Sequence, residues 1–259
     1  MRTNRMTFMA PVVLALVFSL ALLPTVEVSA DQNLDRQLYC AARKGDLEQV
    51  KSLLGDGADV NAWIRKSSTP LMVAVQSGNL DVMKLLIQKG ATVNARTGKG
   101  ATALMDAAMR GNLGAVALLI QEAADVNART RTGVAALMAA VRGGNFEVTK
   151  LLIKKGADPN TKTRDDGVTA LMDAAISGNL GLVKLLVQEG ADVNAIMNEG
   201  GTALMAAALG GKLEIVRLLV QKGADVNTRT NTGETALKLA KGQDADKIRL
   251  FLKAHGAKE

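Results

Sequence analysis

Short apolar segments alternate with polar, glycine-containing stretches along most of this chain. In one unit the polar stretch "RTGKGA" (96–101) precedes the apolar segment "TALMDAAMRG" (102–111). The amphipathic segment "NLGAVALLIQ" (112–121) follows, and comparable segments elsewhere end in Gly-Ala-Asp-Val-Asn. A threonine at the start of an apolar segment can cap a helix, and a glycine after a helix can close it in the left-handed conformation. Each unit therefore predicts a tight turn, a short helix, a second turn and a second helix.

The unit recurs with a nearly constant period. The asparagines that close the units stand at steps of 33, 33, 33, 34 and 33: Asn61, Asn94, Asn127, Asn160, Asn194 and Asn227. The leucines of the apolar segments keep the same steps: Leu71, Leu104, Leu137, Leu171, Leu204 and Leu237. The single extra residue falls within 161–167, where we expect a loop tip to absorb it. A fixed period of this length is the signature of a stacked repeat protein.

The unit resembles the ankyrin repeat. The resemblance rests on Thr69-Pro70-Leu71, the Thr-Ala-Leu variants, the paired leucines such as Leu85-Leu86, and the Gly-Ala-Asp-Val-Asn endings. It covers the chain from about residue 35 to the end and implies an all-α solenoid of helix-turn-helix units with β-turn or hairpin tips. Within a domain at 31–259 we expect about seven units: the caps 35–62 and 229–259, and the full repeats 63–95, 96–128, 129–161, 162–195 and 196–228.

The chain departs from the ankyrin pattern at several positions. Methionine replaces the histidine that ties neighbouring turns in the family, at Met72, Met105, Met138, Met172 and Met205. Methionine cannot make those hydrogen bonds, so the turns must rely more on threonine hydroxyls and the backbone. We interpret this methionine column as core filling; a redox-sensitive seam is the alternative, because methionine oxidises to a polar sulfoxide.

Two alanines predict a soft link in the stack. Ala123 replaces the closing glycine of its unit, at a cost of about 1 kcal/mol if the backbone there needs a positive φ. Ala135 replaces a capping threonine, at a further cost of about 1 kcal/mol. The unit 129–161 is therefore expected to be weakly joined to its neighbours.

The first thirty residues have the composition of a secretory signal peptide. Arg2 and Arg5 precede an apolar run over 12–23, and Val28-Ser29-Ala30 offers a small-residue cleavage site. Cleavage after Ala30 predicts a periplasmic or secreted protein; an uncleaved anchor is the alternative. No later stretch is apolar enough to span a membrane, so we expect no stable membrane insertion after cleavage. The resemblance is then to exported bacterial ankyrin repeat proteins.

The heptapeptide "TALMDAA" occurs twice and places Asp106 and Asp173 at equivalent positions. The two units are separated by another, so neighbouring-helix spacing puts these carboxylates roughly 16–20 Å apart. Carboxylate pairs that cleave glycosidic bonds lie about 5 to 9.5 Å apart. We therefore interpret both aspartates as partly exposed positions on the concave face that form a local ion pair or contact a partner, with Arg110 and Arg142 as ion partners.

The sequence contains few residues that could catalyse a reaction or bind a metal or cofactor. His255 is the single histidine and has no serine or cysteine at a meaningful spacing. Cys40, the single cysteine, is expected to be a small packed residue, with a reactive or intermolecular thiol as the alternative. The sequence offers no Cys/His cluster for zinc and no cofactor motif. We predict a non-enzymatic protein with no catalytic residues, metal or cofactor.

The loop tips carry a row of basic residues. They are Arg65, Lys66, Arg96, Lys99, Arg129, Arg131, Lys162 and Arg164. Trp63 lies at one end of this row, and the apolar pair Ile196-Met197 follows its other end. Tryptophan and arginine are enriched in interface hot spots, so we predict that this edge, together with Asp106, Arg110, Arg142 and Asp173, binds a protein with an acidic surface. A solvated edge that serves solubility is the alternative.

Two functions remain open from the sequence. The first is a monomeric adaptor of the cell envelope, and exported ankyrin proteins that support an envelope enzyme make an accessory role reasonable. The second is a secreted effector or toxin-associated factor that acts on a host protein. Nucleic acid is disfavoured because no aromatic residues are interleaved with the basic ones for base stacking, and because the export signal points away from it. An anionic lipid or polysaccharide of the envelope stays possible as a ligand.

Overall fold

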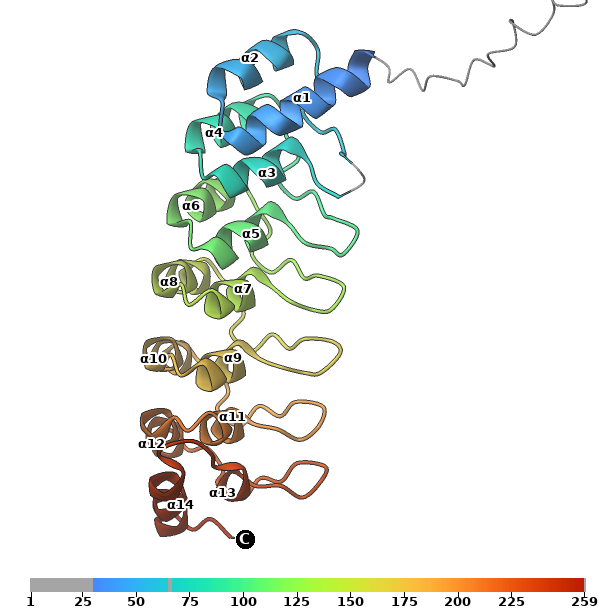
Figure 1. Ribbon diagram of the computed structural model, residues 1–259. Coiled ribbons are helices and arrows are strands. Elements are labelled where there is room, and N and C mark those ends of the chain that lie inside the picture. Colours follow the sequence, from blue (N-terminus) through green and yellow to red (C-terminus); the bar gives the residue numbers. More distant parts are fainter. Residues whose placement is uncertain (1–29, 65–66, 259) are drawn as a thin grey trace, which may run out of the picture.

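The computed structural model describes residues 30–64 and 67–258 and shows an elongated stack of helix pairs (Figure 1). The predicted signal peptide lies outside these residues except for Ala30, where the first helix begins. Fourteen helices are found in the described residues: α1 Ala30–Lys44, α2 Leu47–Gly55, α3 Pro70–Ser77, α4 Leu80–Gln88, α5 Ala103–Arg110, α6 Leu113–Gln121, α7 Ala136–Arg142, α8 Phe146–Lys154, α9 Ala170–Ser177, α10 Leu180–Gln188, α11 Ala203–Leu209, α12 Leu213–Gln221, α13 Ala236–Leu239 and α14 Ala245–Ala254. The expected all-α solenoid of helix-turn-helix units is confirmed.

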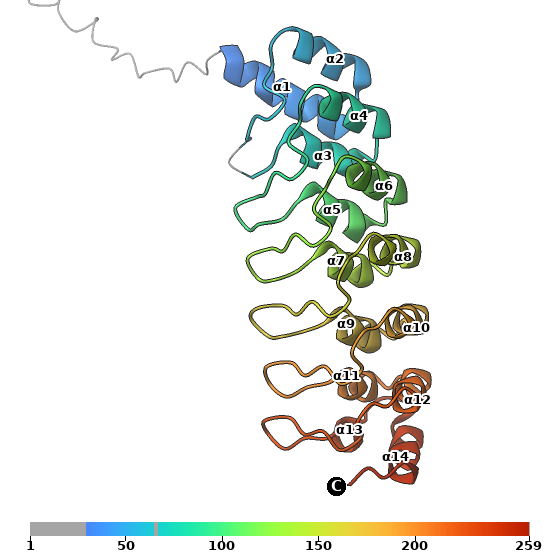
Figure 2. The same ribbon diagram turned by 180° about the vertical axis from the view of Figure 1, so that it is seen from behind.

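The stack consists of two layers of helices and a row of loop tips. The odd-numbered helices form an inner layer beside the projecting loop tips, and the even-numbered helices form an outer layer (Figures 1 and 2). Each odd helix contacts the odd helices of the neighbouring units as well as its own even partner. Because every unit packs only on its neighbours, the hydrophobic core is one continuous seam along the stack.

Local caps set the ends of the helices. In the unit 96–128 the hydroxyl of Thr102 accepts a hydrogen bond from the backbone N–H of Met105 at 3.4 Å. Gly111 ends α5 in the left-handed conformation, and the Asn112 side chain then accepts from the N–H of Ala115 at 2.9 Å to begin α6. Threonine and asparagine caps of this kind recur in other units, so the threonine-capped turns predicted from the sequence are confirmed.

The core between the layers is aliphatic and closely packed. Leu104 and Ala108 on the inner helix and Leu119 on the outer helix are at most 1 % exposed. The methionine column is also buried: Met72, Met105, Met138, Met172 and Met205 are between 1 % and 6 % exposed. These methionines therefore lie in the core between the layers, and their response to an oxidant stays a prediction.

A series of asparagine side chains, which we call the asparagine ladder, joins consecutive units at the turns that follow the outer helices. Asn127 donates from Nδ2 to the carbonyl of Gly156 at 2.8 Å and accepts at Oδ1 from the N–H of Asp158 at 3.0 Å. Equivalent pairs of bonds are made by the closing asparagines Asn61, Asn94, Asn160, Asn194 and Asn227. The asparagine period seen in the sequence therefore records a contact between units.

The two alanines have the local geometry that the sequence predicts, while the soft link expected from them stays a prediction. Ala123 has a φ of 59°, the one positive value at a non-glycine residue in the described chain. Ala135 precedes α7 in an extended conformation and gives it no side-chain cap. Ala123 precedes the unit 129–161, and Ala135 lies within that unit, directly after its loop tip.

Candidate interaction surface

From the tip 96–101 onward, each loop tip is a short hairpin closed by a glycine: Gly100, Gly133, Gly167, Gly200 or Gly233. In the tip 129–134 the N–H of Thr130 donates to the carbonyl of Val134 at 2.9 Å, and Gly133 turns the chain with a φ of +85°. A Cβ on Gly133 would meet the backbone nitrogen of Arg164 at 2.7 Å, so glycine also permits the close approach of the next tip. The expected hairpin tips are confirmed.

The extra residue of the sequence lies in the tip of the unit 162–195. There the N–H of Thr163 donates to the carbonyl of Val168, five residues further on, whereas Thr130 reaches Val134, four residues further on. The loop tip absorbs the insertion, as predicted, and the helices on either side keep their register.

Backbone hydrogen bonds connect the tips to one another. The N–H of Arg131 donates to the carbonyl of Lys99 at 2.9 Å, and the N–H of Arg164 donates to the carbonyl of Thr132 at 2.8 Å. The same bond joins the N–H of Asn198 to Asp166 at 2.9 Å. The tips from 96–101 to 196–201 therefore form one connected edge along the solenoid (Figure 1).

Three residues of the basic row reach across to the next tip. The guanidinium groups of Arg96 and Arg129 donate to the carbonyls of Arg129 and Lys162, and Lys162 Nζ donates to the carbonyl of Ile196 at 2.9 Å. Each of these side chains spans one repeat and satisfies a backbone acceptor. Their charge is thereby placed close to the edge of the stack and their motion is restricted.

Three further basic side chains of the row, all among the described residues, project into solvent. Lys99, Arg131 and Arg164 are exposed, and in the described part of the chain their side chains make no hydrogen bond or ion pair. Arg65 and Lys66 lie outside the described residues. Trp63 is 43 % exposed at the start of the same edge, and Ile196 is 48 % exposed further along.

The two aspartates of the repeated heptapeptide are held in separate ion pairs. Asp106 pairs with Arg110 on the same helix at 3.1 Å, and Asp173 pairs with Arg142 of the preceding unit at 2.7 Å. Helix α7 lies between α5 and α9, so the carboxylates do not meet (Figure 1). The predicted ion partners are confirmed.

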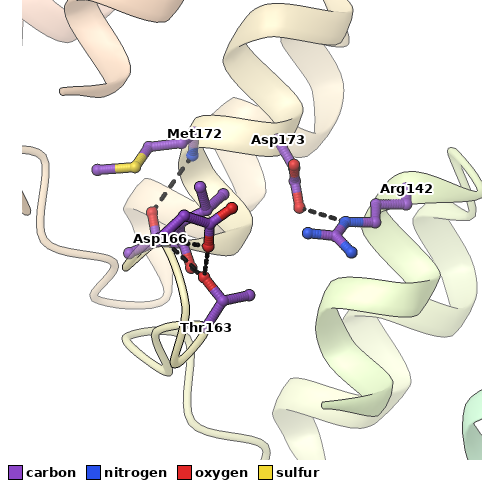
Figure 3. A network of polar contacts seen from close by, with 7 residues as sticks. Arg142, Thr163, Asp166, Met172 and Asp173 are labelled. Atoms are coloured by element: carbon purple, nitrogen blue, oxygen red, sulfur yellow. Dashed lines mark hydrogen bonds and ion pairs between the residues drawn. The ribbon is translucent and has the colours of Figure 1, made fainter. Parts of the chain in front are cut away.

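The Arg142–Asp173 pair has a second carboxylate nearby (Figure 3). Burial raises the pKa of Asp173 above its usual value, and this effect exceeds the opposing effect of the hydrogen bond from Arg142. Asp166 lies in the adjacent tip, where the hydroxyl of Thr163 donates to it and lowers its pKa. The charge of Asp166 also raises the pKa of Asp173, so the tip and the inner helix α9 interact electrostatically.

Sequence reasoning missed a groove at the C-terminal end of the inner face. It has a volume of ≈ 590 Å³ and is lined by residues of α9, α11 and α13 and of the tips 196–201 and 229–234. Ile176 and Leu209, which line it, are 43 % and 41 % exposed. They occupy equivalent positions at the ends of α9 and α11, so the recurrence of large apolar residues at that position was the signal in the sequence.

The described residues do not bring metal-ligating side chains together into a metal site. Over residues 30–64 and 67–258 no three His, Cys, Asp or Glu side chains could hold a metal ion together. His255 ends α14 with its ring against Phe251, at a centroid distance of 4.1 Å. The expectation that Cys40 is packed was wrong: it is exposed, because the buried face of α1 runs through Leu38, Ala41 and Ala42.

These features of the repeats agree with comparisons to known families. A model described as "Ankyrin repeats (3 copies)" matches residues 38–130 and 124–197, and one described as "Ankyrin repeats (many copies)" matches residues 186–240. The chain belongs to the ankyrin repeat family. No curated protein matches the sequence. In the described residues no helix is both long and apolar enough to cross a membrane.

Two solved ankyrin structures illustrate the similarity. The ankyrin repeat domain of Bcl-3, a member of the IkappaB protein family, is 31 % identical with a TM-score of 0.71, and the match covers 82 % of this chain and 96 % of that one. The human ASB11 ankyrin repeat domain is 28 % identical with a TM-score of 0.75 and covers 83 % and 96 %. Ankyrin repeats are generally protein-binding modules, and this chain has that architecture along most of its length.

Proposed function

We propose that this protein is a non-enzymatic binding scaffold of the cell envelope that docks an acidic protein surface on its basic loop tips. The observation that carries the proposal is the set of three projecting cations, Lys99, Arg131 and Arg164, on three consecutive tips. Backbone bonds between these tips keep the charges in a fixed row. A fixed row of like charge favours association with a complementary acidic surface and increases the rate of encounter.

The neighbouring basic residues support this assignment in a different way. Arg96, Arg129 and Lys162 are engaged with backbone carbonyls of the next tip. These side chains add positive potential to the edge, and their hydrogen bonds fix the position of each tip relative to the next. The contact with a partner is therefore assigned to Lys99, Arg131 and Arg164, with Trp63 and Ile196 as apolar flanks.

A charge-reversal experiment tests this proposal. The triple variant Lys99→Glu, Arg131→Glu, Arg164→Glu is compared with Lys89→Glu, Lys155→Glu, Lys222→Glu, which makes the same charge change at the ends of the outer helices α4, α8 and α12. Pull-downs from the envelope fraction, read by quantitative mass spectrometry, should lose acidic partners with the tip variant alone. Equal recovery of the same partners by both variants would refute the basic edge.

Location in the envelope is proposed from the N-terminal sequence. Cell fractionation and N-terminal sequencing of the exported chain test it: a periplasmic protein that begins at Asp31 supports the adaptor function. Release into the medium favours the secreted effector that the sequence left open, and a chain that stays in the cytoplasm contradicts both.

A further inference from the structure

The C-terminal end of the inner face carries an apolar groove, which we call the α9–α13 groove. It opens between the inner helices and the tips 196–201 and 229–234. Its apolar lining consists of Ile176, Met197, Met205, Ala206, Leu209 and Leu239. Of these, Ile176 and Leu209 present more than two fifths of their surface to solvent. Exposed apolar surface that is gathered in a concavity and rimmed by polar groups marks a binding site.

The position of these two side chains separates the groove from the rest of the inner face. At the equivalent site in the preceding unit stands Arg142, which is paired with Asp173. The apolar floor therefore begins at α9, directly after this ion pair, and continues to α13. An occupant of the groove meets hydrophobic side chains over three consecutive inner helices.

The charged residues that line the groove are acidic. They are Glu199 and Glu234, one on each of the two tips. The N–H of Asn231 donates to the carbonyl of Glu199 at 3.0 Å, and the N–H of Thr230 donates to the carbonyl of Glu234 at 2.9 Å. Arg229, on the same tip, turns its guanidinium to the carbonyl of Gly233 at 3.1 Å. The two carboxylates thus stand on hydrogen-bonded tips beside an apolar floor.

We propose that the α9–α13 groove binds an extended segment of a partner protein that combines apolar side chains with lysine or arginine. The apolar side chains lie on Ile176 and Leu209, and the cations face Glu199 and Glu234. Three inner helices at the usual spacing span about 16–20 Å, which an extended chain covers with about six residues. The charge of this groove is opposite to that of the tips that carry Lys99 and Arg131.

This inference does not depend on the basic tip edge, because no basic residue of that edge lines the groove. If both are occupied by one partner, the sign change along the solenoid fixes its direction: its acidic surface meets the N-terminal tips and its basic, apolar segment meets the C-terminal groove. The tip charge-reversal variant leaves the groove intact, so either proposal can fail without the other.

Selection from a random peptide library displayed on phage tests the groove. The bait is the protein purified from cells that express the full chain, and selected peptides are measured by fluorescence anisotropy. We expect peptides that contain leucine, isoleucine or methionine together with lysine or arginine. The double variant Ile176→Ser, Leu209→Ser should weaken their binding about tenfold or more, because it removes apolar surface that the peptide buries. Glu199→Gln, Glu234→Gln should weaken it less and reduce its dependence on salt.

Met109→Ser is the matched control, since Met109 stands at the equivalent position on α5, outside the groove, and is 42 % exposed. Circular dichroism melts of all variants show whether the fold is retained. Failure to select any peptide, selection of acidic or uncharged peptides, or equal binding to the Ile176/Leu209 variant and the wild type would overturn the proposal. A dimer in analytical ultracentrifugation that the same double variant abolishes would instead assign the groove to a second copy of this chain.

Discussion

The Nε atom of Arg142 on α7 lies 2.7 Å from Oδ2 of Asp173 on α9, so one ion pair joins two consecutive repeats. The Asp106–Arg110 pair, by contrast, stays within one helix. The side chain of Asp173 is only 19 % exposed, and its burial outweighs the attraction of Arg142 in setting its pKa. The pair therefore orders the inner face beside the α9–α13 groove at some cost in desolvation.

The raised pKa of Asp173 predicts a pH dependence of stability. The folded protein binds the proton of Asp173 more tightly than the unfolded chain does, so ionisation of this group disfavours folding. Relative to Asp173→Asn, the free energy of unfolding of the wild type should fall as pH rises from below 3.8 through the raised pKa, and then stay level. Urea unfolding of both proteins across this range measures the difference.

Asp166→Asn provides the opposite case for comparison. The pKa of Asp166 is lowered by Thr163, so the stability that this carboxylate contributes is present above pH 3.8 and is lost as pH falls through its folded pKa. A difference between Asp173→Asn and the wild type that does not change with pH, or that changes in the direction expected for Asp166→Asn, would contradict the assignment.

Replacing Ala123 with glycine should stabilise the protein. Ala123 has a φ of 59°, in a region that costs an L-residue with a Cβ about 1 kcal/mol. The net gain in the free energy of unfolding should be about 1 kcal/mol, measured by urea denaturation. Gly156→Ala is the reciprocal control: Gly156 has a φ of +89° with open space around it, and the substitution should lower stability by a similar amount.

Threonine at position 135 should restore a missing helix cap. Ala135 is extended and 4 % exposed, and in the next unit the hydroxyl of Thr169 accepts from the N–H of Met172 at 3.3 Å. Ala135→Thr should therefore raise the free energy of unfolding by about 1 kcal/mol, and Thr169→Ala should lower it by about as much. Thermal melts of the two variants measure both effects, and a lower melting temperature for Ala135→Thr would mean that the site cannot hold the larger side chain.

A substitution at Asn127 tests how much one asparagine of the ladder contributes to stability. Asn127→Ala removes the acceptor for the N–H of Asp158 and the donor for the carbonyl of Gly156, and should cost about 1–2 kcal/mol. Hydrogen exchange read by mass spectrometry should show faster exchange of the Asp158 amide. Asn127→Asp keeps an acceptor, so it should preserve more of this protection than alanine does; equal exchange in both variants would argue against a direct role of the Asn127 side chain.

Peroxide treatment separates the two interpretations of the methionine column. Met109 is 42 % exposed, whereas Met105 is 5 % exposed and Met138 is 1 % exposed. Met109 should form sulfoxide first, and the column should react only when the protein unfolds. Peptide mass spectrometry combined with melting curves follows both steps. Oxidation of the column in the folded protein, with a fall in melting temperature, would support the redox-sensitive seam instead.

Much of the architecture could be predicted because it depends on contacts that are close in sequence. Thr102 caps its helix through Met105, three residues away, and Gly111 closes the same helix one residue after its last turn. Ala123 could be identified as strained because the other units place glycine there. Such features follow from local backbone geometry, which the 33-residue period repeats along the chain.

Contacts between residues one repeat apart could not be predicted from the sequence, because they depend on how neighbouring units stack. The chemistry of arginine does not reveal that Arg96 reaches the carbonyl of Arg129 while Arg131 projects into solvent, because this depends on the distance between neighbouring tips. The same holds for the groove between Leu209 and Glu199, which come from different loops and helices. The period in the sequence determined that the units would stack. The packing of inner helices and tips then determined which side chains were used to hold the stack and which were left exposed to bind a partner.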